Sequence, residues 1–588
     1  MNKASKFFAA FTAVALVSAC SSEEPANGGN DEAVKDGQKA YLAVTINSTG
    51  DMGRSTDYDT PDYTDGSKSE HTVKSARFFF FDAQGNYVMQ ASVVDPAFGP
   101  DNGDQNIEWL STKNILVLED LTSNTYPEYM LTVLNADGFT PGSTISETTM
   151  RLSEFNSNFT ENGNNFVMST TAYYGEDDNH SDTYYNVTKL VADNFKLTPD
   201  EAQNNSPVDV YVERLAAKVQ LGINAASITK NGKKFYKLEQ TVAGGGNDQN
   251  NPDGEANTEL YLEVLGWGLN ATAAESYTGK QFDGNWKNTA PFGSWNNAGL
   301  FRSFWAYSYP YEAGKNADSR LLYTNTTKLN GVLTNDNSDY AQYCYENTNA
   351  AENIFIRNNA GQNLVVPALT THVVLNTRIC NAEGEALPML NFRGTAFLEN
   401  DFKAYVLNTL RNSAAGLNYY YLTGSTDDAS SYTQVDVKDI VFEGIEGKVG
   451  EVNIKLADPD ATLYAKTTAD DGSDKYVPIQ SPDLAQRLTA LQGATPLYWY
   501  NKGANLYYIP VEHNATASTK EKEGYYGVVR NHWYKITVNS FSHIGHAVYD
   551  PDGGSETLKP DTPEDPLYYV GARINVLSWR IISQSVDL

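Results

Sequence analysis

The sequence has little cysteine, little histidine and few basic residues for its length. Its 588 residues include three cysteines and seven histidines, and 43 lysines and arginines stand against 73 aspartates and glutamates. The net charge of −30 argues against a nucleic-acid partner, because phosphate binding requires a clustered basic face. Apart from Cys20, only Cys344 and Cys380 remain. These two can form one disulfide or stay as buried thiols, and they cannot build a four-ligand metal cluster.

Motifs for catalysis are also missing. The sequence contains no G-x-x-x-x-G-K-S/T phosphate loop, no H-E-x-x-H zinc motif and no G-x-S-x-G nucleophile turn. His543 and His546 have no further ligands at useful spacing, and the acidic loops 176–182 and 470–476 lack the alternating ligands of an EF-hand. We therefore expect a protein that is not an enzyme, with no catalytic residue, no metal and no cofactor.

The one apolar run at the N-terminus predicts a lipoprotein signal. Lys3 and Lys6 precede "FFAAFTAVALV", which is too short to span a bilayer and ends in "VSAC". Small residues directly before a cysteine are typical of a bacterial lipobox, in which Cys20 is acylated, for example with palmitate, and becomes the mature N-terminus. An ordinary secretory signal is the alternative. Residues 21–38 form a polar tether, and its "SSEE" resembles export signals of surface-exposed outer-membrane lipoproteins.

Most of the remaining sequence alternates with period 2 and predicts strands. In "YLAVTIN", for example, Leu42, Val44 and Ile46 form one apolar face. Helices are expected only at Asn400–Asn412 and at Ser481–Gly493, where Ser481 is a cap and Pro482 takes the first helical position. With 40% hydrophobic and 12% aromatic residues, the pattern predicts an all-β protein of packed β-sandwiches with short helical decorations.

The first and last strands each follow a flexible segment. The first, "YLAVTI", follows the tether, and the last, "ARINVLSWRII", follows the acidic, proline-bearing spacer 549–566. Arg54 comes soon after the first strand and is the only basic residue between Lys39 and Lys68. Strands on such arms can be ordinary terminal strands, or they can leave their own sheet and join another.

These features together resemble a known family. The lipobox, the tether, the first strand, the arginine loop and "SARFFFFDAQGNYV" look like the start of a fimbrillin, a pilin of the type V pilus, in its Mfa-like, short-fimbria major subunit branch. The segments "YMLTVLNADGF" and "VYVERLAAKVQL" are similar to strands of its N-terminal domain. The C-terminal "LYYIPVEHN" and "ARINVLSWRIISQSVDL" carry the most specific similarity.

The resemblance implies two transthyretin-like β-sandwich domains and assembly by donor-strand exchange. An Arg-specific extracellular protease, gingipain-like, would cut between Arg54 and Ser55 and release the first strand. The C-terminal strand of the next subunit would then fill the groove. The removed strand would comprise Tyr41, Leu42, Ala43, Val44, Thr45 and Ile46, and the donor strand would present Ile574, Val576, Leu577, Trp579 and Ile581.

The same resemblance predicts the domain boundaries, the partners and the location. The partners are further copies of the chain, accessory anchor and tip subunits, the protease and, before cleavage, the outer membrane through the lipid. The protein is expected first as an outer-membrane lipoprotein and then in an extracellular fimbria that supports adhesion. The expected segments are a signal peptide at 1–20, a tether at 21–38, a first strand and cleavable loop at 39–54, β-sandwich domains at 55–220 and 221–548, and a spacer with donor strand at 549–588.

Two alternatives remain open from the sequence. Thirty-eight tyrosines and eight tryptophans suit an outer-membrane surface lipoprotein that binds glycan. An accessory subunit is the other alternative. An anchor would keep its lipid and lack a cleavable arginine, whereas a tip would not need a donor strand.

Overall fold

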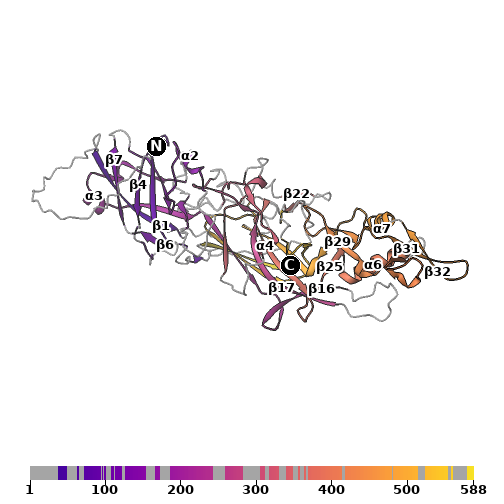
Figure 1. Cartoon of the computed structure of the whole chain (residues 1–588). Coiled ribbons are helices and arrows are strands. Elements are labelled where there is room, and N and C mark those ends of the chain that lie inside the picture. Colours follow the sequence, from indigo (N-terminus) through magenta and orange to yellow (C-terminus); the bar gives the residue numbers. More distant parts are fainter. Residues whose placement is uncertain are drawn as a thin grey trace, which may run out of the picture.

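The chain is described by a computed structural model and consists mainly of strands (Figure 1). This confirms the expected all-β class. Figure 1 shows strands β1, β4, β6 and β7 at one end of an elongated chain, and α6, α7, β31 and β32 at the other. The described residues are 38–49, 63–64, 70, 72–94, 96, 98–100, 107–111, 113–121, 126–153, 166–171, 186–242, 258–281, 305–311, 317–329, 340–348, 355–357, 363–365, 369–412, 418–479, 481–513, 524–553, 558–559 and 579–587.

An 11-stranded sheet forms the N-terminal end of the chain. Its path runs β4-β3-β8-β10-β13-β1-β6-β5, with β7 and β12 also paired to β1 and β11 to β8. The alternating residues of these strands bury two cores, one that includes Phe78 and Val210 and a second that includes Phe79 and Leu131. The strands are β1 (Gln38–Thr49), β3 (Ser75–Phe81), β4 (Tyr87–Val94), β5 (Phe98–Pro100), β6 (Ile107–Ser111), β7 (Asn114–Leu121), β8 (Tyr129–Leu134), β10 (Met168–Thr170), β11 (Thr188–Lys189), β12 (Phe195–Lys196) and β13 (Val208–Arg214).

Two further sheets pack face to face and enclose a core that includes Leu221, Trp267 and Ile536. The seven-stranded sheet is ordered β2 (Tyr63–Thr64), β37 (Trp579–Asp587), β35 (His532–Ser540), β14 (Ala216–Ile223), β21 (Ala341–Tyr345), β18 (Thr272–Ala273) and β20 (Leu321–Leu322). The six-stranded sheet is ordered β15 (Ser227–Lys230), β16 (Lys233–Val242), β17 (Thr258–Asn270), β24 (His372–Cys380), β34 (Ala504–Pro510) and β36 (His546–Ala547).

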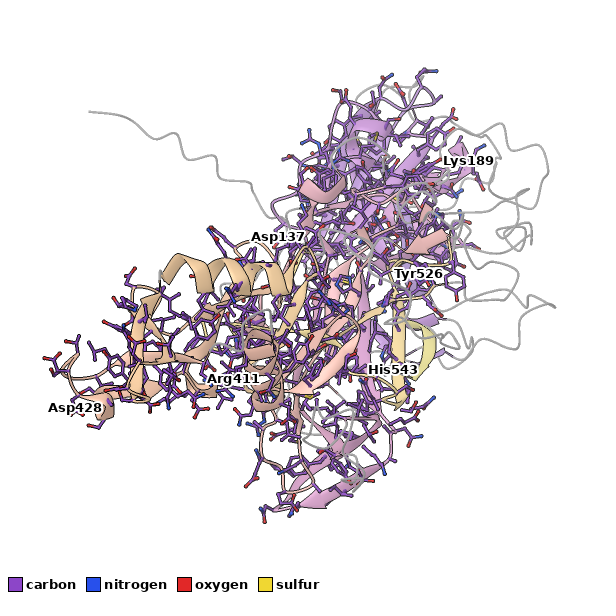
Figure 2. All side chains as sticks on the ribbon, turned by 90° about the vertical axis from the view of Figure 1, so that its right-hand side faces the viewer. Asp137, Lys189, Arg411, Asp428, Tyr526 and His543 are labelled. Atoms are coloured by element: carbon purple, nitrogen blue, oxygen red, sulfur yellow. The ribbon has the colours of Figure 1, made fainter. Side chains whose placement is uncertain are left out.

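Residues 390–497 contain a separate core, which the sequence did not reveal. Both expected helices are confirmed there as α6 (Glu399–Asn412) and α7 (Ser481–Gln492), with Leu484 and Leu488 buried against the small sheets. In Figure 2, Asp428 lies at the outer tip of this unit, far from Lys189 of the N-terminal sheet. Its strands are β25 (Met389–Phe392), β26 (Thr395–Leu398), β27 (Tyr419–Leu422), β28 (Tyr432–Gln434), β29 (Ile440–Gly444), β30 (Val452–Leu456), β31 (Leu463–Thr468), β32 (Asp474–Ile479) and β33 (Leu497–Tyr500).

The remaining elements are short. The pair β9 (Leu152–Ser153) and β19 (Ser276–Tyr277) joins the N-terminal part of the chain to the C-terminal part. The others are β22 (Phe355–Arg357), β23 (Asn363–Val365), α2 (Ile145–Thr149), α3 (Pro199–Asn204), α4 (Thr326–Leu329), η1 (Ala192–Asn194), η4 (Ala317–Arg320), η6 (Ala429–Ser431), η7 (Val437–Asp439) and η8 (Asn501–Gly503).

Candidate functional site: the first and last strands

The first strand, β1, lies in the interior of the N-terminal sheet. On one side it runs parallel to β13, from Val44 opposite Val208 to Ser48 opposite Val212. On the other side it runs antiparallel to β7, with Leu42 opposite Leu116, and then to β6. Because β1 has neighbours along both edges, its loss would leave unpaired backbone groups on two strands at once.

The side chains of β1 complete the N-terminal core. Ala40, Leu42 and Val44 have no exposed surface and pack in the cluster that contains Phe78. Each fully buried leucine or valine contributes about 1.5–3 kcal/mol relative to its exposed state. Removing β1 would therefore open a row of apolar pockets between β13 and β7.

The alternation predicted one buried face for this strand, and the structure shows burial on both. Ala43, placed by the pattern on the opposite face from Leu42, is only 4% exposed. A strand that is covered on both faces of its sheet buries side chains on both, and a small residue such as Ala43 fits the second face. Thr45 and Ile46 also lie in β1, opposite Asp209 and Val210 of β13.

The last strand, β37, lies in the sheet of its own subunit rather than apart from it. It runs parallel to β35, with Ile581 opposite Trp533, and its other edge pairs with the two-residue strand β2, where Thr64 lies opposite Trp579. Of the candidate donor residues, Trp579 and Ile581 are thus placed in β37. Ile574, Val576 and Leu577 lie outside the described residues.

The other sequence-predicted site residues also fall outside the described part of the chain. These are Cys20, Arg54 and Ser55. Their roles stay predictions. The structure does place the segments that flank Arg54, because β1 ends at Thr49 and β2 begins at Tyr63.

A buried ionic cluster around Glu70 follows β2 closely in sequence. The Tyr343 hydroxyl donates to the Glu70 carboxylate at 2.6 Å, and Lys218 Nζ lies 2.9 Å from the same oxygen. Arg214, the last residue of β13, donates from Nε to the Glu70 carbonyl at 2.7 Å and from a terminal guanidinium nitrogen to Asn531 at 3.0 Å. Glu70 has no exposed surface, so this cluster fixes the chain shortly after the Arg54 segment.

The charges of this cluster favour an ionised Glu70. Burial acts to raise the pKa of the Glu70 carboxyl, but Lys218 and Arg214, with the hydrogen bond from Tyr343, outweigh it and hold that pKa below its ordinary value. The sequence search missed this cluster. The available signal was Arg214 and Lys218 inside the apolar strand run "VYVERLAAKVQL", since charged residues in such runs are buried only when paired.

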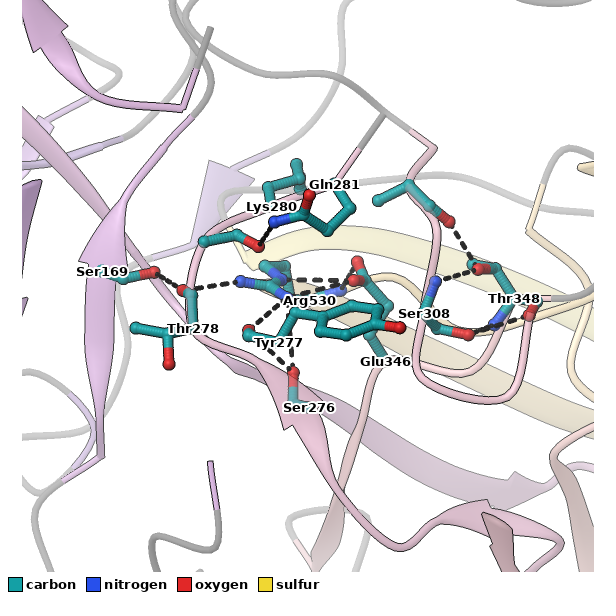
Figure 3. A network of polar contacts seen from close by, with 12 residues as sticks. Ser169, Ser276, Tyr277, Thr278, Lys280, Gln281, Ser308, Glu346, Thr348 and Arg530 are labelled. Atoms are coloured by element: carbon teal, nitrogen blue, oxygen red, sulfur yellow. Dashed lines mark hydrogen bonds and ion pairs between the residues drawn. The ribbon is translucent and has the colours of Figure 1, made fainter. Parts of the chain in front are cut away.

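A second buried network joins the N-terminal sheet to the C-terminal sandwich (Figure 3). Arg530, just before β35, donates to the Glu346 carboxylate at 3.2 Å and to the Tyr277 carbonyl at 2.9 Å, and both charged side chains are about 1% exposed. Lys280 Nζ lies 3.2 Å from the Glu213 carboxylate of β13, again with both side chains buried. Burial lowers the pKa of Lys280, and the neighbouring Glu213 opposes that shift.

The two networks define a continuous polar junction between the two terminal strands. β13 is the neighbour of β1 and ends at Glu213 and Arg214, while Arg530 and Asn531 immediately precede β35, the neighbour of β37. The Ser169 hydroxyl of β10 adds a 2.6 Å hydrogen bond to the Thr278 carbonyl across the same junction. These contacts therefore connect the strand next to β1 with the segment that precedes the strand next to β37.

The structure also places the two cysteines and two histidines that the sequence left as polar candidates. Cys344 and Cys380 are free and buried, and burial raises the pKa of their thiols to about 12 and about 11. His543 is exposed, whereas His546 lies in β36 beside Tyr508, and burial lowers the pKa of His546 to about 3. Within the described ranges, no group of three or more histidines, cysteines or acidic residues lies close enough to hold a metal ion. In the same part of the chain, no helix has the length and apolar character needed to cross a membrane.

Fold and terminal strands together define an all-β subunit whose two ends complete separate sheets. Residues 498–585 match the family model described as the C-terminal region of fimbrillin, the major fimbrial subunit protein type IV. The resemblance to fimbrillins predicted from the sequence is thereby confirmed over this region, and it supports a fimbrial subunit at the cell surface. No curated protein matches the chain.

Several solved structures are weakly similar to this chain. The fimbrilin fimA from Porphyromonas gingivalis W83 is 11% identical, with 93% of this chain and 96% of that chain covered and a TM-score of 0.28. The tip fimbrial protein Mfa3 from Porphyromonas gingivalis is 11% identical, over 60% of this chain and 83% of that chain, with a TM-score of 0.24. A fimbrial assembly protein from Parabacteroides distasonis is 12% identical, over 59% and 87%, with a TM-score of 0.25. At such TM-scores these likenesses carry no argument.

Proposed function

We propose that the chain is a structural subunit of a cell-surface fimbria that polymerises by protease-triggered donor-strand exchange. Cleavage after Arg54 frees β1, and the C-terminal strand of a second copy enters the vacated groove. The observation that carries the proposal is the position of β1, which completes the N-terminal core and directly precedes the segment that contains Arg54.

The unpaired edges and apolar pockets of the open groove favour binding of an extended strand with alternating apolar side chains. Loss of β1 leaves edges on β13 and β7 and apolar pockets where Ala40, Leu42 and Val44 were. An extended strand with alternating apolar residues satisfies both, because main-chain hydrogen bonds supply affinity and alternate side chains fill the pockets. In the C-terminal strand, Leu577, Trp579 and Ile581 alternate in this way. The incoming strand would run parallel to β13, as β1 does.

Such a contact builds a filament. The acceptor groove lies in the N-terminal sheet and the donor strand at the C-terminus, so each subunit offers one of each. Head-to-tail contacts that do not close on themselves propagate without limit. An anchor subunit and a tip subunit would end the fibre on either side, and adhesion would be carried by the assembled fimbria.

Export as a lipoprotein fits the order of these events. Acylation at Cys20 would hold the precursor on the outer membrane, and the tether would keep the Arg54 segment within reach of an Arg-specific extracellular protease. Cleavage would free the subunit from its lipid and open the groove in a single step. The intact β1 keeps the groove closed until then.

Replacing Arg54 with alanine is expected to abolish polymerisation. Without cleavage, β1 stays in its sheet, and its buried side chains and two paired edges exclude a competing strand. The measurement is incubation of the purified precursor with an Arg-specific protease, followed by size-exclusion chromatography and electron microscopy. Arg151→Ala, which changes an exposed arginine outside the sheet that contains β1, serves as the matched control and should polymerise like the unaltered chain. Normal polymers from Arg54→Ala would contradict the cleavage step.

A further inference from the structure

The C-terminal strand has strand partners on both of its edges. β35 runs along one edge, from His532 opposite Arg580 to Ser540 opposite Asp587. β2 covers the start of the other edge, with Tyr63 opposite Arg580 and Thr64 opposite Trp579. A strand held this way cannot enter another subunit until both pairings break. The pairing with β35 comes from the body of the domain, whereas β2 comes from the other end of the chain.

β2 lies between Arg54 and Glu70, so it remains in the subunit after the proposed cleavage. Cleavage would turn it into part of a new N-terminal arm that is free at one end. At the other end the arm is fastened by Glu70, which is buried and bound by Lys218, Tyr343 and Arg214. The arm therefore has one fixed end close to the C-terminal sheet.

The fixed end and β2 lie within reach of one another. Lys218, the partner of Glu70, belongs to β14, and its Nζ lies 4.0 Å from the ring centroid of Trp533, the residue opposite Ile581 of β37. In the order β2-β37-β35-β14, β2 and β14 are separated by about 14 Å, at roughly 4.8 Å for each strand spacing. The chain from Thr64 to Glu70 extends up to about 20 Å, which covers this span.

We propose that β2 is a clasp that holds the donor strand on its own subunit and that must let go before β37 can enter a neighbouring groove. The clasp rests on the proposed donor-strand function and adds a second control to it. Cleavage at Arg54 opens the acceptor groove, but β2 still pairs with the donor strand. The C-terminal strand of a cleaved subunit therefore stays in its own sheet and is not exposed to solvent. A clasp of two residues suits this purpose, because losing one or two backbone hydrogen bonds shifts an equilibrium by only about five- to thirtyfold.

A reversible disulfide across the clasp tests the proposal. Tyr63 and Arg580 are paired across antiparallel strands, where Cα separations of about 4.5–5.5 Å permit a disulfide. The double variant Tyr63→Cys with Arg580→Cys should form this bond in the uncut precursor. Burial and raised thiol pKa values keep Cys344 and Cys380 out of the reaction, and the lipid proposed on Cys20 blocks the third cysteine.

After Arg-specific cleavage, the oxidised double variant should stay monomeric and the reduced one should polymerise like the unaltered chain. The disulfide ties β37 to Tyr63, and the chain from Tyr63 to Glu70 limits its travel to about 23 Å. Tyr63→Cys with Ser583→Cys is the matched control, because Ser583 lies opposite Lys535 and not opposite β2. This control should not cross-link within the subunit and should polymerise in both redox states.

Three results would overturn the clasp, and they are distinguishable. Failure of the Tyr63–Arg580 pair to cross-link would show that β2 does not hold β37. Equal polymerisation of the oxidised and reduced forms would show that the contact is present but does not restrain exchange. If the unaltered cleaved chain also fails to polymerise, the donor-strand function itself fails, and the clasp fails with it.

Discussion

Subunits that lack residues 569–588 are expected to remain monomeric after cleavage at Arg54. Their groove opens as in the unaltered chain, but no donor strand is available to fill it. The deletion removes β37 and its pairing with β35, and all residues of the cores around Phe78 and Ile536 given above remain in the chain. Light scattering after protease treatment, with mass spectrometry to confirm loss of the first strand, measures the outcome.

The truncated subunit also provides a sharper test when it is mixed with intact subunits. It keeps an acceptor groove and lacks a donor, so each truncated copy that joins a fibre ends growth at its own C-terminal end. Increasing the truncated fraction should shorten the fibres progressively in electron micrographs. Fibres of unchanged length, or polymers of the truncated chain alone, would contradict the role of the C-terminal strand.

Replacing Arg530 with methionine is expected to lower the free energy of unfolding by about 3–5 kcal/mol. The guanidinium is about 1% exposed and donates to the Glu346 carboxylate and to the Tyr277 carbonyl. Methionine fills a similar volume but removes the cation that is hydrogen-bonded to the buried Glu346 carboxylate, which is the costly part of the change. Urea unfolding followed by circular dichroism measures the loss.

Two further variants show whether the loss of stability in Arg530→Met comes from the unpaired charge or from altered packing. The double variant Arg530→Met with Glu346→Met should recover most of the lost stability, because an apolar pair of similar volume often replaces a buried ion pair at little cost. Arg151→Met, at an exposed arginine, should change the free energy of unfolding by less than about 0.5 kcal/mol. A loss below about 1 kcal/mol for Arg530→Met would contradict the assignment of this network as a junction that stabilises the contact between the N-terminal sheet and the C-terminal sandwich.

Sequence patterns predicted strands and helices well where interactions between residues close in the sequence determine the structure. The alternation of Leu42 and Val44 placed the first strand, and it forms β1. The helix at Ser481 was predicted from its cap and from Pro482 at the first helical position, and α7 ends where Gly493, at φ 64°, donates to the Thr489 carbonyl at 2.8 Å. These signals act within a few residues of one another, so a single sequence contains them in full.

Strand pairings between segments that are distant in the sequence could not be predicted from sequence patterns. β1 lies parallel to β13, whose residues follow it by more than 160 positions, and no local pattern encodes that choice. The ion pair between Lys280 and Glu213 depends in the same way on two sheets meeting. The separate core of residues 390–497 was also missed, since short strands and two helices inside a β-rich sequence give no boundary signal.

The candidate site was predicted from the two ends of the sequence, and its roles stay predictions; the structure adds the strands that neighbour β1 and β37. The sequence indicated a removable first strand and a donor-like last strand, and the resemblance to fimbrillins joined them in one mechanism. The structure adds that both strands run parallel to a long neighbour, β13 for β1 and β35 for β37. It also adds β2 and Glu70, which follow the Arg54 segment and connect it to the sheet that holds β37.

The N-terminal residue of subunits in fibres recovered from the cell surface tests the central claim most directly. If β1 is removed by cleavage after Arg54, mass spectrometry of the polymer should find chains that begin at Ser55 and lack residues 41–46. Fibres built from chains that still begin at an acylated Cys20 and retain β1 would contradict the account.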